Sequence, residues 1–260
     1  IYYRQLTAIL ALGVTPMELL LGFLAKDGDP MSNARQFPLH GALGRVDVFS
    51  FSNVVGTQIP QAAGVALADK MRGEPRVTLV YFGDGASSTG DCHEGMNFAG
   101  VHNLPVVFFC ENNRYAISVP LEKQTRLANV SGRAGAYGFE GITVDGMDPI
   151  GVFEAVYSAT EKARMGGGPS LIEVLVERLL PHTTDDDHTR YRPTHELETM
   201  DDRDPITKTE TMLKSRGILN DMLIQKIQHA SKAHVESATS GAEAAEYPDP
   251  STIANNLLAD

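Results

Sequence analysis

Residues 77–118 read VTLVYFGDGASSTGDCHEGMNFAGVHNLPVVFFCENNRYAIS. Val77–Phe82 and Val106–Cys110 are short continuous apolar runs, the pattern of strands buried on both faces. The first run ends in Gly83-Asp84-Gly85, a helical stretch that includes Gly95–Val101 follows, and the second run ends in Asn112-Asn113. This order predicts two parallel strands joined by a crossover helix.

The alternation of strand and helix continues along the chain. A third strand is expected at Gly141–Asp145, a helix at Pro149–Arg164 and a fourth strand at Ser170–Arg178. Strands alternating with helices imply parallel pairing and right-handed crossovers. The sequence therefore predicts an α/β fold with a doubly wound parallel sheet.

The segment before the sheet is expected to be helical at three places. We expect helices near Tyr2–Leu12, at Leu19–Lys26 after a capping box at Thr15, and at Thr57–Arg72, which has a face of small residues and should lie centrally. The intervening stretch, Asp27–Asn53, is long and rich in Gly, Pro, Ser and Asn, as functional or disordered loops are.

The C-terminal part is expected to differ from the rest. From Pro205 the pattern is helical, and the stretch Ser237–Asp260 offers little core-forming material. We therefore divide the chain into an α/β domain at residues 1–204 and a helical C-terminal extension at residues 205–260. Because the sequence opens at Ile1 without a methionine, we suspect a fragment of a longer polypeptide.

Composition excludes several classes of protein. The 260 residues carry 22 basic and 33 acidic side chains, a net charge of -11, which argues against a nucleic-acid partner. The apolar runs are far shorter than the roughly 18 residues that cross a bilayer, so no membrane span is expected. The two cysteines, Cys92 and Cys110, lack metal or redox spacing and fit a reducing compartment.

Asp84 and Asn113 form the candidate metal site. Each follows a strand, and the carboxyl ends of neighbouring parallel strands form the ligand crevice of an open sheet. Carboxylate and amide oxygens suit magnesium, which completes its octahedron with phosphate and water. Flanking glycines and the following helix start favour a diphosphate. Each motif alone is an ordinary turn, and the ordered pair is what favours a magnesium-diphosphate site.

The same motifs carry a resemblance to a known family. Gly83 to Asn113 resembles the thiamine-diphosphate fingerprint of transketolase-like enzymes. Four flanking stretches narrow this resemblance to the alpha subunits of the 2-oxo acid dehydrogenases; they are TQIPQAAG at 57–64, ENNRYAIS at 111–118, VDGMD at 144–148 and HTTDDDHTRYRP at 182–193. The resemblance covers the chain from about Tyr2 to about Pro205.

The resemblance implies roles for individual residues. Magnesium would be held by the side chains of Asp84 and Asn113 and the backbone carbonyl of Tyr115. Cofactor contacts are implied for a set spread along the chain: Tyr3, Arg4, Val55, Asp84, Gly85, Ala86, Asn113, Ile117, Arg178 and His182. His182 is the implied catalytic residue, since a histidine can change charge near neutral pH during acyl transfer. At Glu111, related chains can carry a basic residue, so that one contact with the diphosphate is in doubt.

Other residues have weaker implied roles. Asp186, Tyr191 and Arg192 are expected to order the loop around His182 rather than take part in chemistry. Thr183 and Thr184 could accept phosphate, as hydroxyl residues do there in animal members of the family. His40 matches a family histidine near the channel, and an ordinary loop histidine is an equal alternative. A potassium ion in branched-chain members would correspond to Ser52, Val54, Thr57 and Gln58.

The implied enzyme decarboxylates a small 2-oxo acid on thiamine diphosphate and passes the acyl group to a lipoyl group of a dihydrolipoyl acyltransferase. The activating glutamate lies on a beta subunit in two-chain members, so an alpha2-beta2 heterotetramer is implied. Branched-chain substrates are favoured, with pyruvate or acetoin dehydrogenase as alternatives. A non-catalytic magnesium-binding module and a phosphatase are readings from other classes. The location would be cytoplasmic in a bacterium or the mitochondrial matrix in a eukaryote.

Overall fold

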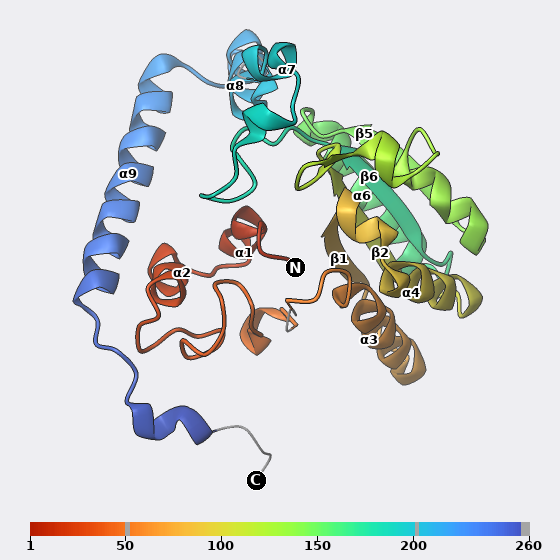
Figure 1. Ribbon diagram of the computed structural model, residues 1–260, viewed down its shortest axis with the longest axis horizontal. Coiled ribbons are helices and arrows are strands. Elements are labelled where there is room, and N and C mark those ends of the chain that lie inside the picture. Colours follow the sequence, from red (N-terminus) through yellow and green to blue (C-terminus); the bar gives the residue numbers. More distant parts are fainter. Residues whose placement is uncertain (50–52, 201–202, 256–260) are drawn as a thin grey trace. The chain divides into compact units, whose positions relative to one another are not determined.

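The computed structural model describes residues 1–49, 53–200 and 203–255, and the chain forms two compact units (Figure 1). Unit 1 combines residues 1–53 with residues 219–260, and unit 2 comprises residues 54–218. These divisions do not coincide with the boundary expected after residue 204. The C-terminal segment joins the N-terminal one in unit 1.

Unit 2 contains a sheet of four parallel strands, which confirms the expected α/β class. The strand order is β1-β2-β6-β5, and the bounds are Thr78–Gly83 for β1, Val106–Asn112 for β2, Glu140–Asp145 for β5 and Ser170–Leu175 for β6. All four strands were expected at these places. β6 ends at Leu175, three residues earlier than the expected end at Arg178.

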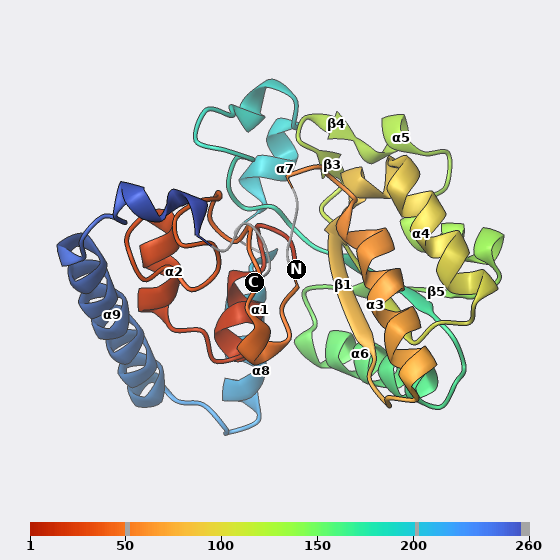
Figure 2. The ribbon, with the colours of Figure 1, turned by 90° about the horizontal axis from the view of Figure 1, so that it is seen from below.

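Helices cover both faces of this sheet (Figure 2). On one face, Phe82 and Phe108 pack with residues of α3 (Gln58–Arg72), α4 (Gly90–Val101) and the 3-10 helix η3 (Val130–Tyr137). On the other face, Val107 and Ile172 pack against α6 (Pro149–Arg164). Successive strand residues alternate between the two clusters because side chains alternate across a strand. The two crossover helices α4 and α6 therefore lie on opposite faces, as in a doubly wound sheet.

The small residues of α3 permit close helix packing, as expected. Ala62, Ala63 and Ala66 are buried, and α3 packs against α4. A Cβ atom on Gly95 of α4 would lie 2.9 Å from the backbone nitrogen of Pro60, too close for any side chain. Gly64, counted in the small face by the sequence, is exposed instead.

The short elements that follow β2 and β6 form the rest of unit 2. A small antiparallel hairpin joins β3 (Tyr115–Ala116) to β4 (Val119–Pro120), and α5 (Leu121–Gln124) follows it. After β6 the described residues include η4 (His188–Arg190), α7 (Thr194–Glu198) and α8 (Pro205–Ser215).

Unit 1 is helical. Its elements are α1 (Leu6–Ala11), α2 (Pro16–Phe23), η1 (Gly44–Val46), α9 (Asp221–Ala244) and η6 (Pro250–Ala254). The capping box expected at the start of α2 is confirmed: Glu18 N–H donates to Thr15 Oγ1, and Thr15 N–H donates to the Glu18 carboxylate. α1 is shorter than expected and begins at Leu6.

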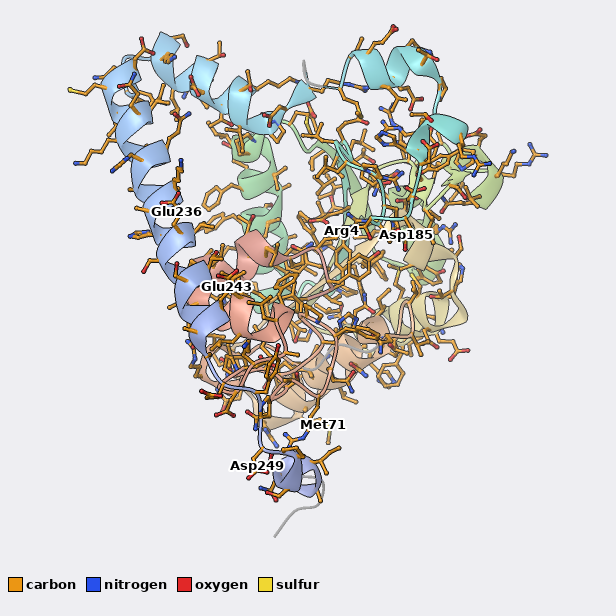
Figure 3. The ribbon with its side chains drawn as sticks, turned by 60° about the vertical axis from the view of Figure 1, so that its left-hand side comes forward. Arg4, Met71, Asp185, Glu236, Glu243 and Asp249 are labelled. Atoms are coloured by element: carbon orange, nitrogen blue, oxygen red, sulfur yellow. The ribbon has the colours of Figure 1, made fainter. Side chains whose placement is uncertain are left out.

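Within the described residues 237–255, the stretch expected to offer little core-forming material does contribute to packing, through the end of α9. α9 packs against α2, and Ala238 and Ala242 of α9 are buried. Gly241 lies so close to Met17 that a Cβ atom would be 3.0 Å from its sulfur. Glu236 and Glu243 occupy exposed positions of the same helix (Figure 3). The alanine-rich stretch is thus a helix face that uses small side chains for close approach.

No helix within the described residues is both long enough and apolar enough to cross a bilayer.

Candidate functional site

Asp84 lies directly after β1, and the structure brings it together with Asn113 after β2. The Asp84 residue is 1% exposed, and Gln124 Nε2 donates to its Oδ2 atom over 2.8 Å. The backbone N–H groups of Asp84 and Asn113 also donate to this carboxylate. The pairing of Gly83 with Glu111 explains the proximity, because it aligns the ends of two neighbouring strands.

Burial controls the protonation of Asp84. Desolvation raises the pKa of its carboxyl above the ordinary 3.8, while the Gln124 amide, the two backbone N–H groups and the charge of Arg178 oppose the rise. A raised pKa means that the surroundings do not fully stabilise the negative charge. A cation at this carboxylate would supply the missing stabilisation.

Asn113 and Tyr115 form a turn at the end of β2. Tyr115 N–H donates to Asn113 Oδ1 over 3.1 Å. Leu121 N–H donates to the Arg114 carbonyl, so the next pair, Tyr115 with Pro120, is a non-hydrogen-bonded pair of the hairpin. Groups of such a pair point away from the partner strand. Pro120 has no backbone N–H, so it donates no hydrogen bond to the carbonyl of its pair partner Tyr115.

Glu173 is a site residue that the sequence analysis missed. Its carboxylate is fully buried on β6 and accepts hydrogen bonds from Asn112 Nδ2 (2.6 Å), Val130 N–H and Ser131 N–H (3.0 Å each), and Thr143 Oγ1 (3.1 Å). Asn112 Oδ1 in turn accepts from Arg114 N–H. This fixes the turn that contains Asn113. A single acid inside the apolar run SLIEVL was the available signal.

The glycines beside Asp84 were expected to let the backbone approach a diphosphate, and the structure gives Gly85 a packing role. A Cβ atom on Gly85 would lie 2.8 Å from the Cβ atom of Ala116, so this glycine lets the β3 hairpin approach. A Cβ atom on Gly83 would lie 3.9 Å from the Glu111 carbonyl oxygen, which is an ordinary van der Waals contact. The segment after Gly83 is the 3-10 helix η2 (Asp84–Ser88), and α4 begins only at Gly90. The expected helix start directly after the motif is therefore a 3-10 turn, and it contains Gly85 and Ala86.

Arg178 holds Ile117 at the edge of this region. Arg178 Nη1 donates to the Ile117 carbonyl over 2.9 Å, and Arg178 is 6% exposed. Ile117 has a φ of 57°, in the left-handed region that β-branched residues rarely occupy. Its side chain is largely exposed. Arg178 Nε is buried without a hydrogen-bond partner in the described part of the chain, so one donor of the guanidinium remains for an anion.

Asp186, Tyr191 and Arg192 order the loop after β6, as expected. Asp186 Oδ2 accepts from His182 N–H (2.7 Å) and from Tyr191 OH (2.6 Å), and these bonds lower the pKa of its carboxyl, the Tyr191 bond most. Arg178 Nη2 donates to Tyr191 OH. Arg192 is buried and donates to the Arg178 carbonyl.

The hydroxyl residues of this loop are accessible. Thr183 and Thr184 are exposed, and so is the neighbouring Asp185. His182 is half-buried and is held through its backbone N–H by Asp186. Its role toward a cofactor stays a prediction.

The roles of several other residues stay predictions. Tyr3 and Arg4 belong to unit 1, where the Arg4 guanidinium lies 5.3 Å from the centre of the Tyr3 ring. His40 is buried in unit 1, with Nδ1 2.8 Å from the Pro38 carbonyl. Val55, in unit 2, is 55% exposed.

The implied potassium ligands have protein contacts of their own. Thr57 Oγ1 donates to the Val54 carbonyl, and Gln58 Nε2 donates to the Tyr81 carbonyl. Ser52 lies outside the described residues.

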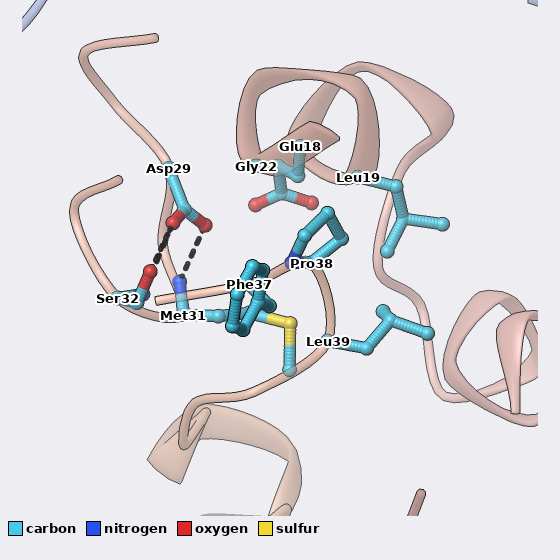
Figure 4. Close-up of a pocket in the computed structure, with 9 residues that line it drawn as sticks. All are labelled: Glu18, Leu19, Gly22, Asp29, Met31, Ser32, Phe37, Pro38 and Leu39. Carbon is cyan, nitrogen blue, oxygen red and sulfur yellow. Dashed lines mark hydrogen bonds between the residues drawn. The ribbon is translucent and has the colours of Figure 1, made fainter. Parts of the chain in front are cut away.

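Each unit has a cavity. In unit 1 a pocket of about 10 Å³ has room for about one water molecule, and Asp29, Met31 and Ser32 line part of it (Figure 4). In unit 2 a cavity of about 590 Å³ opens at the ends of β2 and β6, where Asn112, Tyr115 and Leu175 line it. Only the second is large enough for an organic ligand.

The donor set around Asp84 fits magnesium better than zinc. Within residues 1–49, 53–200 and 203–255, no group of three or more His, Cys, Asp and Glu is placed to hold a metal ion. Zinc sites use such groups. An aspartate, an asparagine and a carbonyl form an all-oxygen set, which hard cations prefer and complete with phosphate and water.

Comparison with known proteins shows the family to which the chain is similar. Residues 1–251 match the family model described as "Dehydrogenase E1 component". The 2-oxoisovalerate dehydrogenase subunit alpha of Bacillus subtilis (strain 168) is 44% identical over 258 residues, 99% of this chain and 78% of that protein.

Pyruvate dehydrogenase E1 component alpha subunits are also similar. The subunit of Bacillus cereus is 44% identical over 74% of this chain, and that of Bacillus subtilis (strain 168) is 41% identical over 76%. The chain spans about half the length of these two relatives, 52% and 54%.

Proposed function

The chain belongs to the dehydrogenase E1 component family, and from this premise we propose that it is the alpha subunit of a thiamine-diphosphate-dependent 2-oxo acid dehydrogenase. One observation carries the proposal: the buried Asp84 carboxylate meets Asn113 at the ends of neighbouring parallel strands. This is the place where open α/β sheets bind ligands. Family membership removes the phosphatase alternative.

Several residues would hold the cofactor. Asp84, Asn113 and the Tyr115 carbonyl would bind Mg²⁺, which carries the diphosphate. The spare donor of Arg178 would neutralise diphosphate charge. When bound, thiamine diphosphate supplies the carbanion chemistry that decarboxylates a 2-oxo acid. The chain's own residues place and charge-balance the cofactor, and His182 would move a proton or stabilise charge during acyl transfer.

We propose a branched-chain 2-oxo acid as the substrate. The relative named for 2-oxoisovalerate matches 99% of the chain, whereas the pyruvate dehydrogenase subunits match about three quarters of it at similar identity. The longer match includes α9, which packs on α2 in unit 1. Pyruvate is the second candidate.

The partners follow from the same proposal. A beta subunit would complete an alpha2-beta2 heterotetramer, and the lipoyl domain of a dihydrolipoyl acyltransferase would receive the acyl group. The relatives compared above are bacterial, so we propose a cytoplasmic location.

The metal assignment is tested with Asp84→Ala. We expect this variant, co-expressed with a beta subunit, to lose Mg²⁺-dependent binding of thiamine diphosphate in a calorimeter. Asp69→Ala is the matched control, because Asp69 is another buried aspartate of unit 2 and lies on α3. Unchanged cofactor affinity in Asp84→Ala would contradict the assignment.

His182 and the substrate require separate experiments. We expect His182→Ala to retain the cofactor and to lose acylation of the lipoyl domain, measured by mass spectrometry. Normal acylation in this variant would remove the catalytic role of His182.

A panel of pyruvate, 2-oxoisovalerate and 2-oxoisocaproate on the co-expressed complex tests the substrate. Faster turnover of pyruvate than of the two branched acids would favour the second candidate.

A further inference from the structure

We propose that Gln124 is a positioning residue of the cation site: it holds the Asp84 carboxylate in place and presents its own amide oxygen to the hydration shell of the cation. This inference rests on the proposed function, because it needs a cation at Asp84.

The Gln124 amide makes two hydrogen bonds through one nitrogen atom. Nε2 donates to Asp84 Oδ2 over 2.8 Å and to the Val119 carbonyl over 2.9 Å. Both partners are acceptors, so both amide protons are used and the orientation of the amide is set. The amide oxygen cannot exchange places with the nitrogen without facing two oxygen atoms. Gln124 is thus a clamp between the hairpin at Val119 and the carboxylate of Asp84.

The remaining atom, Gln124 Oε1, is buried and has no hydrogen-bond partner in the described part of the chain. A buried acceptor without a donor is costly, and native proteins usually satisfy such atoms. The same amide is held against Asp84 through its nitrogen, so a group bound beside this carboxylate can supply the donor for Oε1. Water held by a divalent cation is such a donor, since Mg²⁺ keeps several waters when few protein ligands bind it.

The fold gives Gln124 this position through the β3–β4 hairpin. α5 follows β4 directly, and Leu121 N–H donates to the Arg114 carbonyl, which ties the start of α5 to the turn after Asn113. Gly85 has no side chain, and this allows Ala116 of the hairpin to approach the segment that contains Asp84. The hydrogen bond between Gln124 and Asp84 therefore joins the two segments that carry the implied metal ligands. One contains Asp84, and the other contains Tyr115 in the hairpin that leads to α5.

The test uses Gln124→Met in the full chain co-expressed with a beta subunit. Methionine keeps the length of the side chain and removes both hydrogen-bonding functions. We expect the dissociation constant of Mg²⁺, measured by calorimetry in the presence of thiamine diphosphate, to rise about 10-fold to 100-fold, the usual effect of removing a residue that orients a metal ligand. Lys123→Met is the control, because Lys123 lies on the same short helix and is exposed. It should bind Mg²⁺ like the wild type.

A second readout separates positioning from general damage. Mg²⁺ needs near-octahedral geometry, whereas Ca²⁺ accepts flexible geometry, so a loosened Asp84 should weaken Mg²⁺ more than Ca²⁺. We expect the ratio of the two dissociation constants to change in Gln124→Met and to stay constant in Lys123→Met. Equal losses for both cations, or unchanged Mg²⁺ affinity, would overturn the role of Gln124. If the wild-type complex itself bound no Mg²⁺ with thiamine diphosphate, the proposed function would fail instead.

Discussion

At the scale of single residues, Glu173 shows how a buried charge can organise a site without touching a ligand. Four donors from the end of β2, the start of η3 and β5 converge on its carboxylate. Two of them are the first backbone N–H groups of η3, where the helix dipole also favours a negative charge. Only a group that accepts through both oxygens satisfies all four donors.

The Glu173→Gln variant tests this account. The new NH₂ group must face either Val130 N–H or Ser131 N–H, so at least one donor loses its acceptor. We expect a loss of about 2–4 kcal/mol in the free energy of unfolding, measured by urea denaturation. Glu140→Gln is the control, because Glu140 is exposed on β5 and pairs only at the surface with Lys162. Equal small effects in both variants would refute the organising role of Glu173.

The buried carboxylate of Asp84 should lower the stability of the cation-free fold, and the size of this loss should depend on pH. Its folded pKa is raised above the ordinary 3.8, chiefly by burial, so folding disfavours its ionised form. The cost is therefore present above the folded pKa and disappears as the pH falls below the unfolded value. We expect the melting temperature of Asp84→Asn relative to that of the wild-type cation-free chain to be higher at about pH 8 than at about pH 4, because the amide carries no charge to desolvate.

Asp187 supplies a control of opposite sign. Its pKa is lowered, mainly by the Thr189 hydroxyl, so its charge stabilises the fold above the ordinary 3.8 and that stability is lost as the pH falls through the folded pKa. Asp187→Asn should therefore give no gain in melting temperature at about pH 8. A gain in Asp84→Asn that did not depend on pH would contradict the electrostatic explanation.

The sequence predicted the residues of the site that lie in motifs and missed those that act through contacts. Asp84 and Asn113 follow strands, so the parallel pairing of β1 and β2 was enough to bring them together. Gln124 and Glu173 are distant in sequence from the residues that they hold, and nothing in their local pattern announces the partner. Their roles depend on the β3–β4 hairpin and on the register of β6 with β2.

At the scale of elements, the sequence predicted the sheet well because strand sequences buried on both faces have a strong signal. The bounds of α6 agree at both ends, since Asp148 caps its first turn, Pro149 starts it and glycines end it. The packing contribution of α9 was underestimated from the sequence. Its packing face consists of alanine and glycine, and such residues signal close approach only when the partner helix is known.

Lys26 should stabilise the contact between α2 and α9. It is buried, donates through Nζ to the carbonyls of Glu243 (3.3 Å) and Ala245 (2.7 Å) at the end of α9, and lies 4.0 Å from the centre of the Tyr247 ring. We expect Lys26→Met to cost about 1–3 kcal/mol, because two carbonyls lose a charged donor at the negative end of the helix dipole.

Hydrogen exchange measures this effect where it should occur. Amides of residues 240–247 should exchange faster in Lys26→Met, while those of β2 in unit 2 should not change. Lys232→Met is the control on the same helix, because the ion pair of Lys232 with Glu236 is exposed to solvent. Unchanged protection of the end of α9 in Lys26→Met would show that the alanine face alone holds the helix.

At the scale of the whole molecule, a net charge of -11 is compatible with binding a diphosphate because the positive groups are local. Arg178 is buried beside Ile117 with a donor to spare, and its charge acts on Asp84. A cation bound at Asp84 would add further positive charge at the same place. The overall charge argues only against a nucleic-acid partner, which stays a prediction, and it says little about one local site, since screening confines the effect of distant surface charges.

The chain by itself should be catalytically incomplete. The described residues contain one four-stranded parallel sheet and so one set of strand ends of the kind that binds a diphosphate. The proposed chemistry also needs a glutamate at the aminopyrimidine end of the cofactor, which the family places on the beta subunit. We expect the purified chain to release no CO₂ from 2-oxoisovalerate with thiamine diphosphate and Mg²⁺, and the co-expressed complex to release it at a rate typical of enzymes, about 1–1000 per second. The Asp84→Ala complex serves as the control for the metal. Turnover by the chain alone would show that it contains its own activating acid.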